Sequence, residues 1–488
     1  MHDTVAPPER AGRWTRAIAE TRLSTAWVVA AIAVPMAIAI STPLSSVDLT
    51  YQIRAGELML DAGRIARADV FTVSAFGDPW LDQQWGAQVV LAAIFRGGGW
   101  LALALFRGVA TALVTSMVYG ACRNAGATRR WAAGLTLAAG VFATGGFLVR
   151  PQLFGMLCFA STQWLLSRRN DHPTSVLWAL PLVVVWANTH GSFFLALPLI
   201  AIAVAQDVQR RTPIARPLLV TGLAAIPLTL LNPFGARIWS YTASIAIDPR
   251  IRNGVVEWQP PTIETVAGTL FLVSVVAVAL FVGWRWREAT WPTFAGLGFF
   301  LVLGLSSIRA SLWWLLAAPV LIAPLTPRGP RERADPRSRL NAALVGILCL
   351  LAVAPLIGWL PYPDRDPPGS LLTSAPAGIT RALVDTVEPG QPIFNAQRWG
   401  SWFEFALPDN PVFVDSRWEV VPDAAWDDYD AVSDGREGWE GILDAYGFEV
   451  VALAREEQAP LLSVIEHDPE WRLVHRDEDG AVFVRANA

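Results

Sequence analysis

The feature that most constrains this chain is a succession of apolar stretches, many of them long enough to cross the hydrocarbon core of a lipid bilayer. Only 16 % of its 488 residues are charged, whereas soluble proteins carry about a quarter. A segment inside a bilayer must satisfy its own backbone hydrogen bonds, so these stretches are expected to be helices. We therefore predict a polytopic α-helical membrane protein of about eleven transmembrane helices, over residues 24–41, 99–122, 131–149, 152–167, 175–189, 192–208, 217–232, 264–284, 291–307, 309–325 and 340–360.

The distribution of arginine indicates the topology. All 38 basic residues are arginine, and a group of them ending at Arg22 precedes the first span. Positive residues favour the cytoplasmic side, so the N-terminal segment 1–23 is placed in the cytoplasm of a bacterial plasma membrane. Every second connection is then arginine-rich, which leaves the C-terminal region outside. The arginines assigned to the cytoplasmic side are Arg10, Arg13, Arg16, Arg22, Arg123, Arg129, Arg130, Arg168, Arg169, Arg210, Arg211, Arg216, Arg285, Arg287, Arg328, Arg331, Arg333, Arg337 and Arg339.

A change of composition divides the chain into a membrane part, 24–360, and a C-terminal part, 361–488. The C-terminal part holds 25 of the 42 acidic residues but only 9 of the 38 arginines. An acidic domain repels nucleic acid, which excludes that class of partner. Short β-like runs alternate with helical stretches there, so we expect a small α/β domain with a mostly parallel sheet and a terminal hairpin. Its tryptophans are equally compatible with a sugar-binding surface and with a core; they are Trp399, Trp402, Trp418 and Trp426. The proposed linker contains Pro361, Pro363, Pro367 and Pro368.

The first external loop, 42–98, combines two carboxylates with an amphipathic pattern. Asp48 follows the first span, and apolar residues then recur at helical spacing, which predicts a short helix in the membrane interface. Asp82 lies in a second polar segment, just before Trp85. The apolar segment 84–98 is too short to span and is expected to be an interfacial or re-entrant helix.

Polar and ionisable residues near the span ends gather on the external side. Such groups are costly in a helix bundle and tend to face a cavity or a partner, so we predict an externally facing cleft. Each also has a structural alternative: Asp48 as a helix cap, the Arg150-Pro151 and Asn232-Pro233 segments as turns, and the tryptophans as an interfacial belt. The residues are Asp48, Arg54, Asp82, Arg150, Gln152, Asn188, His190, Asn232, Glu257 and Arg309, with Trp85 beside them.

The order of these segments resembles bacterial membrane glycosyltransferases of the GT-C superfamily that use polyprenyl-phosphate-linked sugars. The resemblance covers essentially the whole chain. It departs from the pattern of relatives at Gln83 and Gln84, where an acidic residue or histidine is common. The motifs that carry it are Asp48 with 51–57, 79–85, Arg150-Pro151-Gln152, Asn188-Thr189-His190-Gly191, Asn232-Pro233-Phe234-Gly235, Glu257-Trp258, 395–400 and 412–417.

The resemblance implies that Asp48 is the catalytic acidic residue of the first external loop, with Asp82 as a second carboxylate. A carboxylate at this depth can deprotonate an acceptor hydroxyl, and guanidinium groups match the oxygens of a leaving phosphate. No cofactor is required by the pattern, although Asp48 and Asp82 together are a possible site for a divalent cation. The residues expected to bind the donor phosphate are Arg54, Arg150 and Arg309. Those expected to make other contacts with the substrates are Gln152, Asn188, His190, Asn232, Glu257 and Trp85.

The predicted function is inverting sugar transfer from a polyprenyl-phosphate donor to an extracytoplasmic acceptor, which is an envelope glycan, lipid or protein. Membrane lipids are the other expected partners. One alternative is a transporter or flippase of a lipid-linked substrate. Against a transporter, we detect no inverted repeat in the sequence. Arg107 is the one charged residue that lies well inside a predicted span. The other alternative is a non-catalytic envelope scaffold.

Overall fold

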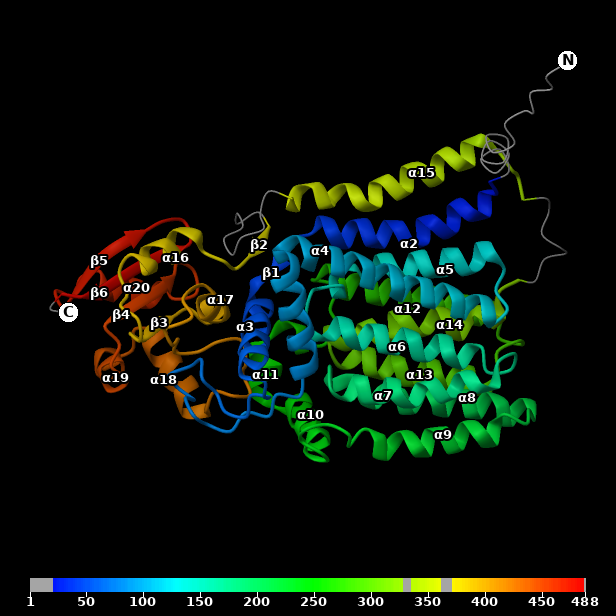
Figure 1. The fold of residues 1–488 in the computed structure, drawn as a ribbon, viewed down its shortest axis with the longest axis horizontal. Coiled ribbons are helices and arrows are strands. Elements are labelled where there is room, and N and C mark those ends of the chain that lie inside the picture. Colours follow the sequence, from blue (N-terminus) through cyan, green and yellow to red (C-terminus); the bar gives the residue numbers. More distant parts are fainter. Residues whose placement is uncertain (1–20, 328–334, 361–370, 487–488) are drawn as a thin grey trace, which may run out of the picture.

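The computed structural model describes residues 21–327, 335–360 and 371–486. The chain forms a bundle of roughly parallel and antiparallel helices, and the C-terminal region packs against one end of it (Figure 1). The bundle helices are α2 (Leu23–Ser41), α4 (Trp85–Asn124), α5 (Arg129–Phe142), α6 (Pro151–Ser167), η2 (Pro173–Trp178), α7 (Ala179–Ala187), η3 (Gly191–Leu195), α8 (Ala196–Arg210), α9 (Ala215–Leu228), α12 (Val266–Trp284), α13 (Trp291–Ser306), α14 (Ile308–Ile322), α15 (Arg339–Val353) and η6 (Ala354–Trp359).

Every predicted span coincides with a helical segment of this bundle. Among the described residues, six helices are long and apolar enough to cross a membrane, and three shorter apolar helices accompany them. The chain is therefore a multi-helical membrane protein, and the full number of crossings stays a prediction. The six are Leu23–Ser41, Trp85–Asn124, Gly191–Arg210, Val266–Trp284, Ile308–Leu325 and Arg339–Trp359.

The connections that are rich in arginine gather at the end of the bundle away from the C-terminal region (Figure 1). Arg130 forms an ion pair with Asp335, with 3.3 Å between Nη2 and Oδ1. The Nε of Arg285 donates to the Leu325 carbonyl at 3.1 Å. Residues 1–20 and 328–334, with their arginines, lie outside the described residues. The alternation read from the sequence is thus reproduced as two chemically different ends, and which end faces the cytoplasm stays a prediction.

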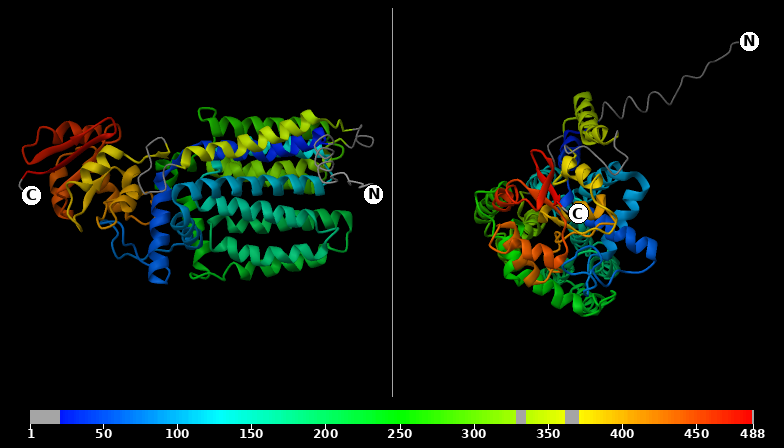
Figure 2. Two further views of the ribbon diagram at one scale, coloured as in Figure 1. Left: turned by 45° about the horizontal axis from the view of Figure 1, so that its top comes forward. Right: turned by 90° about the vertical axis from the view of Figure 1, so that its left-hand side faces the viewer.

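Helix α3 (Ser46–Ala62) lies across the end of the bundle, between the spans and the C-terminal region (Figure 2, left). A helix is therefore present where the sequence predicts one, with Leu49 and Ile53 buried, and its position in the membrane interface stays a prediction. Its buried face is covered by protein: Thr50 donates to the carbonyl of Ser401 at 2.8 Å. On the side of α4, a Cβ at Gly56 would meet the Gln88 carbonyl oxygen at 2.2 Å.

Helix α4 contains a break that separates the short apolar segment from the span. Gly98 and Gly99 have non-helical backbone angles, and Gly99 has φ 57° and ψ −147°, which glycine adopts readily. The residues before the break pack against α3, and those after it form a bundle helix. The break thus falls at the boundary expected between 84–98 and the span at 99–122, and the interfacial or re-entrant placement of 84–98 stays a prediction.

The C-terminal region contains a small mixed sheet in the order β3-β4-β6-β5. The prediction of a mostly parallel sheet is wrong: only β3 and β4 are parallel, and the terminal hairpin β5–β6, which was predicted, pairs antiparallel with β4 through β6. The run 411–415 adds only isolated bridges from Val412. The elements are β2 (Leu372–Thr373), α16 (Ala377–Val384), β3 (Ile393–Asn395), α17 (Gln397–Ala406), α18 (Asp423–Ser433), α19 (Trp439–Tyr446), β4 (Val450–Ala454), α20 (Ala459–Ile465), β5 (Trp471–Arg476) and β6 (Gly480–Arg485).

Segments far apart in the sequence join this region to the first external loop. Strand β1 (Leu44–Ser45) pairs in parallel with β2, and Thr72 bridges to Val412. Arg417 is buried and forms an ion pair with Asp69 of the loop, 2.6 Å from Nη1 to Oδ1. The proposed proline linker lies outside the described residues. The C-terminal region is thus anchored over a broad surface to the end of the bundle.

Candidate functional site

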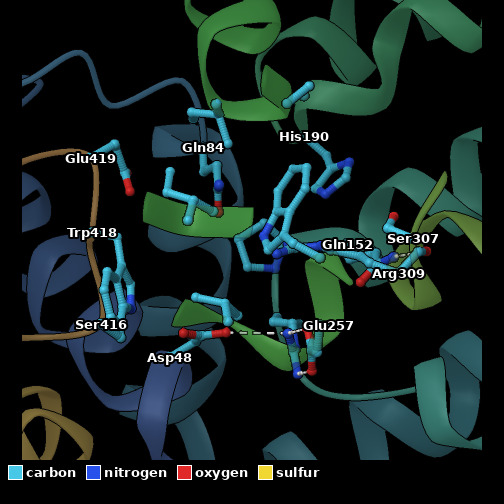
Figure 3. Close-up of a pocket in the computed structure, with 18 of the residues that line it drawn as sticks. Asp48, Gln84, Gln152, His190, Glu257, Ser307, Arg309, Ser416, Trp418 and Glu419 are labelled. Carbon is cyan, nitrogen blue, oxygen red and sulfur yellow. Dashed lines mark hydrogen bonds and ion pairs between the residues drawn. The ribbon is translucent and has the colours of Figure 1, made fainter. Parts of the chain in front are cut away.

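A cavity of about 660 Å³ lies where the end of the bundle meets the C-terminal region. Loop helices α10 (Arg237–Ile247) and α11 (Pro249–Gly254), followed by η4 (Val256–Trp258), form one of its walls. Cavities of this size bind small molecules or parts of larger ones. Six of the predicted site residues line it: Asp48, Arg150, Gln152, His190, Glu257 and Arg309 (Figure 3).

The centre of the site is a guanidinium held between two carboxylates. Arg150 precedes α6 with extended backbone angles, because Pro151 begins the helix, and its side chain projects into the cavity. It makes a bidentate contact with Glu257, 2.7 Å for each oxygen, and its Nη1 lies 3.2 Å from Oδ2 of Asp48. Burial acts to raise the pKa of the Glu257 carboxyl, but the charge and hydrogen bonds of Arg150, together with the charge of Arg309, outweigh it and lower that pKa.

Asp48 lies in the first turn of α3, where the helix dipole favours a negative charge. Its side chain is about one third exposed (32 %), and it points toward Arg150 (Figure 3). No partner for its second oxygen, Oδ1, is found among the described residues. Asp48 therefore keeps one oxygen free to accept a hydrogen bond or a proton from a ligand in the cavity.

Arg309 supplies a cation that the protein itself leaves without a carboxylate. It is in the first turn of α14, whose start is capped by Ser307, and its guanidinium lies 5.6 Å from the ring centre of Trp258. Gln152 donates to its backbone carbonyl at 3.3 Å. Within the described ranges no acidic group comes within ion-pair distance of it. An anion in the cavity would satisfy this charge.

His190 is oriented by its neighbours. Its Nδ1 lies 2.7 Å from the Ser192 hydroxyl, which also accepts from the indole nitrogen of Trp186 at 3.0 Å. A Cβ at Gly155 would come within 2.9 Å of the same imidazole nitrogen, so the ring is closely packed. His190 lines the cavity and is buried, which suits a residue that shapes the wall.

Two of the predicted catalytic or phosphate-binding residues do not line the cavity. Asp82 is buried behind it, where its Oδ1 accepts from Gln88 at 2.9 Å, and burial raises its pKa to about 7. Arg54 lies nearly two turns further along α3 and faces Glu57, 4.0 Å away. The structure brings neither into contact with the Asp48–Arg150 pair, because α3 and the loop turn their side chains away from the opening.

The remaining predicted contacts hold the surrounding loops. Asn188 accepts from the indole of Trp85 at 3.1 Å and donates to the carbonyl of Leu231 at 2.8 Å. Asn232 stabilises its own turn through the backbone of Phe234 and Gly235. None of Trp85, Asn188 and Asn232 lines the cavity, so the turn interpretation holds for Asn232.

The C-terminal region supplies a wall that the sequence did not assign. Ser416, Trp418 and Glu419 line the cavity, and Tyr241 of α10 donates to Glu419 at 2.9 Å. The motif 412–417 was part of the resemblance, but nothing in the sequence pointed these side chains at Asp48. Of the four tryptophans considered, Trp399, Trp402 and Trp426 are core residues and Trp418 lines the cavity.

A shared divalent cation at Asp48 and Asp82 does not fit this arrangement. Asp48 lines the cavity, Asp82 does not, and Gln88 occupies one oxygen of Asp82. Between Asp48 and Glu257 the positive charge is already that of Arg150. Among the described residues no group of three or more histidine, cysteine or acidic side chains is disposed to hold a metal ion.

No protein-family model matches the chain, and no curated protein matches it in sequence. Solved structures do match. The archaeal oligosaccharyltransferase AglB from Archaeoglobus fulgidus, in complex with an inhibitory peptide and a dolichol-phosphate, aligns over 99 % of this chain and 75 % of its own (TM-score 0.56, 11 % identity). The arabinofuranosyltransferase AftD from Mycobacteria aligns over 94 % of this chain and 40 % of its own (TM-score 0.57, 15 % identity).

ArnT from Cupriavidus metallidurans bound to undecaprenyl phosphate aligns over 97 % of this chain and 98 % of its own (TM-score 0.52, 14 % identity). At these identities the likeness concerns the fold. This chain shares, over nearly its whole length, the fold of the GT-C membrane glycosyltransferases that use polyprenyl-phosphate donors.

Proposed function

We propose that the protein transfers a sugar from a polyprenyl-phosphate-linked donor to an extracytoplasmic acceptor. The observation that carries this proposal is that one cavity presents a carboxylate with a free oxygen, Asp48, beside two arginines, Arg150 and Arg309. These are the groups that such a reaction needs. The shared fold supports it, since AglB and ArnT have been solved with dolichol-phosphate and undecaprenyl phosphate.

The reaction would use these side chains as follows. The acceptor hydroxyl attacks the anomeric carbon of the donor sugar while Asp48 takes the hydroxyl proton. The bond from that carbon to the phosphate oxygen breaks, and the polyprenyl phosphate leaves with the bonding electrons. Arg309, with Arg150 beside it, stabilises the charge that develops on the phosphate. A single displacement of this kind inverts the anomeric centre.

The test is transfer by the full-length protein in proteoliposomes that contain radiolabelled undecaprenyl-phosphate sugars and an envelope fraction as acceptor. Asp48→Asn is expected to reduce transfer by about a hundredfold or more, the size of a typical general-base contribution. Binding of undecaprenyl phosphate should remain. Asp61→Asn, at the exposed end of the same helix, is the matched control and should leave transfer unchanged.

Two results would overturn the proposal. If wild-type protein moves the labelled lipid across the bilayer without transferring sugar, it is a flippase. If it neither transfers sugar nor moves the lipid, the result favours a non-catalytic envelope scaffold. If Asp48→Asn transfers sugar at the wild-type rate, Asp48 is not the general base.

The proposal places the cavity and the C-terminal region outside the cytoplasm, with eleven crossings by the count of predicted spans. Cysteines introduced one at a time test this orientation in intact cells, in protein whose Cys122, Cys158 and Cys349 are replaced by serine. Glu456→Cys in the exposed turn after β4 should react with a membrane-impermeant maleimide, and Asp171→Cys between α6 and η2 should react only after lysis. The reverse pattern would invert the topology.

A further inference from the structure

The cavity has two chemically different sides. Arg150 and Arg309 come from the bundle, whereas Ser416, Trp418 and Glu419 come from the segment between Val412 and α18. In Figure 3, Trp418 and Glu419 lie across the cavity from Arg309. A donor phosphate would bind at the arginines, so the side of Glu419, across the cavity, is left for another part of the reaction.

Trp418 is held as a rigid aromatic surface. One face of its ring stacks on Trp426, with 4.3 Å between ring centres and 15° between planes. The indole nitrogen of Trp426 donates to the Trp418 carbonyl at 3.3 Å, and a Cβ at Gly254 would come within 2.7 Å of the ring edge. The Trp418 side chain nevertheless remains half-buried and lines the cavity. Such an orientation is fixed before any ligand arrives, which lowers the entropic cost of binding.

Glu419 provides the polar group beside this ring. The hydroxyl of Tyr241 donates to its Oε1 at 2.9 Å, and no other side chain in the described ranges bonds the carboxylate. Tyr241 belongs to α10, so the hydrogen bond fixes the carboxylate from the opposite wall of the cavity. The carboxylate lines the cavity, where it can accept a further hydrogen bond from a ligand.

The position of this segment is set by a buried ionic cluster directly behind it. Arg417 is 1 % exposed and pairs with Asp69 and Asp415, and its guanidinium lies 4.7 Å from the ring centre of Trp80. These contacts fix the backbone of the segment from which Ser416, Trp418 and Glu419 reach the cavity.

We propose that Trp418 and Glu419, with Tyr241, form an acceptor subsite for a carbohydrate. The inference deepens the proposed function and rests on it. A pyranose or furanose ring presents C–H groups on its faces and hydroxyl groups around its edge. The C–H face packs on the Trp418 ring, and the edge hydroxyls donate to Glu419, a charge-assisted hydrogen bond. The next hydroxyl of the acceptor then lies toward Asp48.

The experiment measures binding by saturation-transfer NMR to the full-length protein in nanodiscs. The probes are free di- and trisaccharides of pyranose and furanose type and, separately, unmodified pentapeptides. We expect saccharides to bind wild-type protein, and Trp418→Leu and Glu419→Gln each to weaken binding about tenfold. Trp178→Leu, at an exposed tryptophan away from the cavity, is the matched control and should bind like wild type.

Undecaprenyl phosphate binding is measured on the same samples, because it separates this inference from the proposed function. Trp418→Leu and Glu419→Gln should keep it, which also shows that the variants are folded. Any of three results would overturn the carbohydrate subsite. Saccharides bind these variants as tightly as wild type, saccharides do not bind wild type, or peptides bind in a way that depends on Trp418. If wild-type protein does not bind undecaprenyl phosphate, the proposed function is overturned instead.

Discussion

At the scale of single residues, the cavity separates two kinds of arginine. Arg150 is already neutralised by Asp48 and Glu257, and its fork geometry holds both carboxylates in place. Within the described residues Arg309 has no ion-pair partner, and its guanidinium lies beside the ring of Trp258. The first arginine therefore organises the site, and the second is the one that can bind a ligand without breaking an ion pair.

Arg309→Met should test that difference. Removing a charged donor from the phosphate is expected to weaken undecaprenyl phosphate binding by about ten- to a hundredfold. Arg96→Met is the control, since Arg96 lies at the same end of the bundle but pairs with the exposed Asp61. Microscale thermophoresis in nanodiscs measures the dissociation constants. Equal constants for Arg309→Met and wild type would show that the lipid phosphate binds elsewhere.

Asp82 is expected to make stability depend on pH. Burial raises its pKa from 3.8 to about 7, so the folded state holds a proton that the unfolded state releases. The folded form therefore loses stability as pH rises from about 4 to about 7. Asp82→Asn resembles the protonated acid and should flatten this slope.

The measurement is the apparent melting temperature in detergent across that pH range. Asp78→Asn, in the same loop and exposed, is the control and should keep the wild-type slope. A slope that persists in Asp82→Asn would assign the pH dependence to another group.

At the scale of elements, the break in α4 decides where the bundle stops and the site begins. The residues before Gly98 lie against α3, which carries Asp48, and those after Gly99 run through the bundle. A continuous helix would carry the N-terminal half of α4 away from α3. The support of Asp48 thus depends on the backbone conformation at Gly98 and Gly99.

Gly99→Ala is expected to destabilise the protein by about 1–3 kcal/mol, because φ 57° with ψ −147° is strained for any residue with a Cβ. Gly97→Ala, two residues earlier in the same helix and in open space, is the control and should be neutral. Thermal unfolding followed by circular dichroism compares the two. Similar melting temperatures would mean that the break tolerates a side chain.

At the scale of the whole molecule, Arg417 joins the first external loop to the C-terminal region. It binds Asp69 from one and Asp415 from the other, and all three are buried. Glu404 lies nearby, and burial together with the charge of Asp415 raises its pKa well above the usual range. One cation thus pairs with two buried carboxylates, and the third carboxyl, that of Glu404, favours its neutral form.

Arg417→Met should destabilise the protein by about 3–5 kcal/mol, because two buried carboxylates lose their partner. Limited proteolysis should then cut the loop around residues 68–78 faster than in wild type. Arg436→Met removes an exposed ion pair with Asp434 and should have little effect. If the loop of Arg417→Met is cut at the wild-type rate, the two regions are held together by apolar contacts alone.

Much of the fold and part of the site were readable from local patterns. Apolar stretches located the bundle helices, and proximity to span ends led to Asp48, Arg150 and Arg309. The same rule also selected two residues outside the cavity: Asn232 stabilises a turn, and Arg54 pairs with Glu57 on its own helix. The reason is that polarity at a span end does not tell which way a side chain points. The sheet was mispredicted for a similar reason: β-like runs do not encode their partners, and β6 inserted antiparallel between β4 and β5.

The sequence by itself determined that the chain is a helical membrane protein with two chemically different ends, since hydrophobic periodicity and arginine placement are local properties. Only the tertiary structure decided which polar residues share a cavity. Asp48, Arg150, Glu257 and Glu419 lie in four separate segments, and their meeting depends on long-range packing of the C-terminal region on α3 and the loops. No local pattern carries that information, because contacts between distant segments arise only when the whole chain folds.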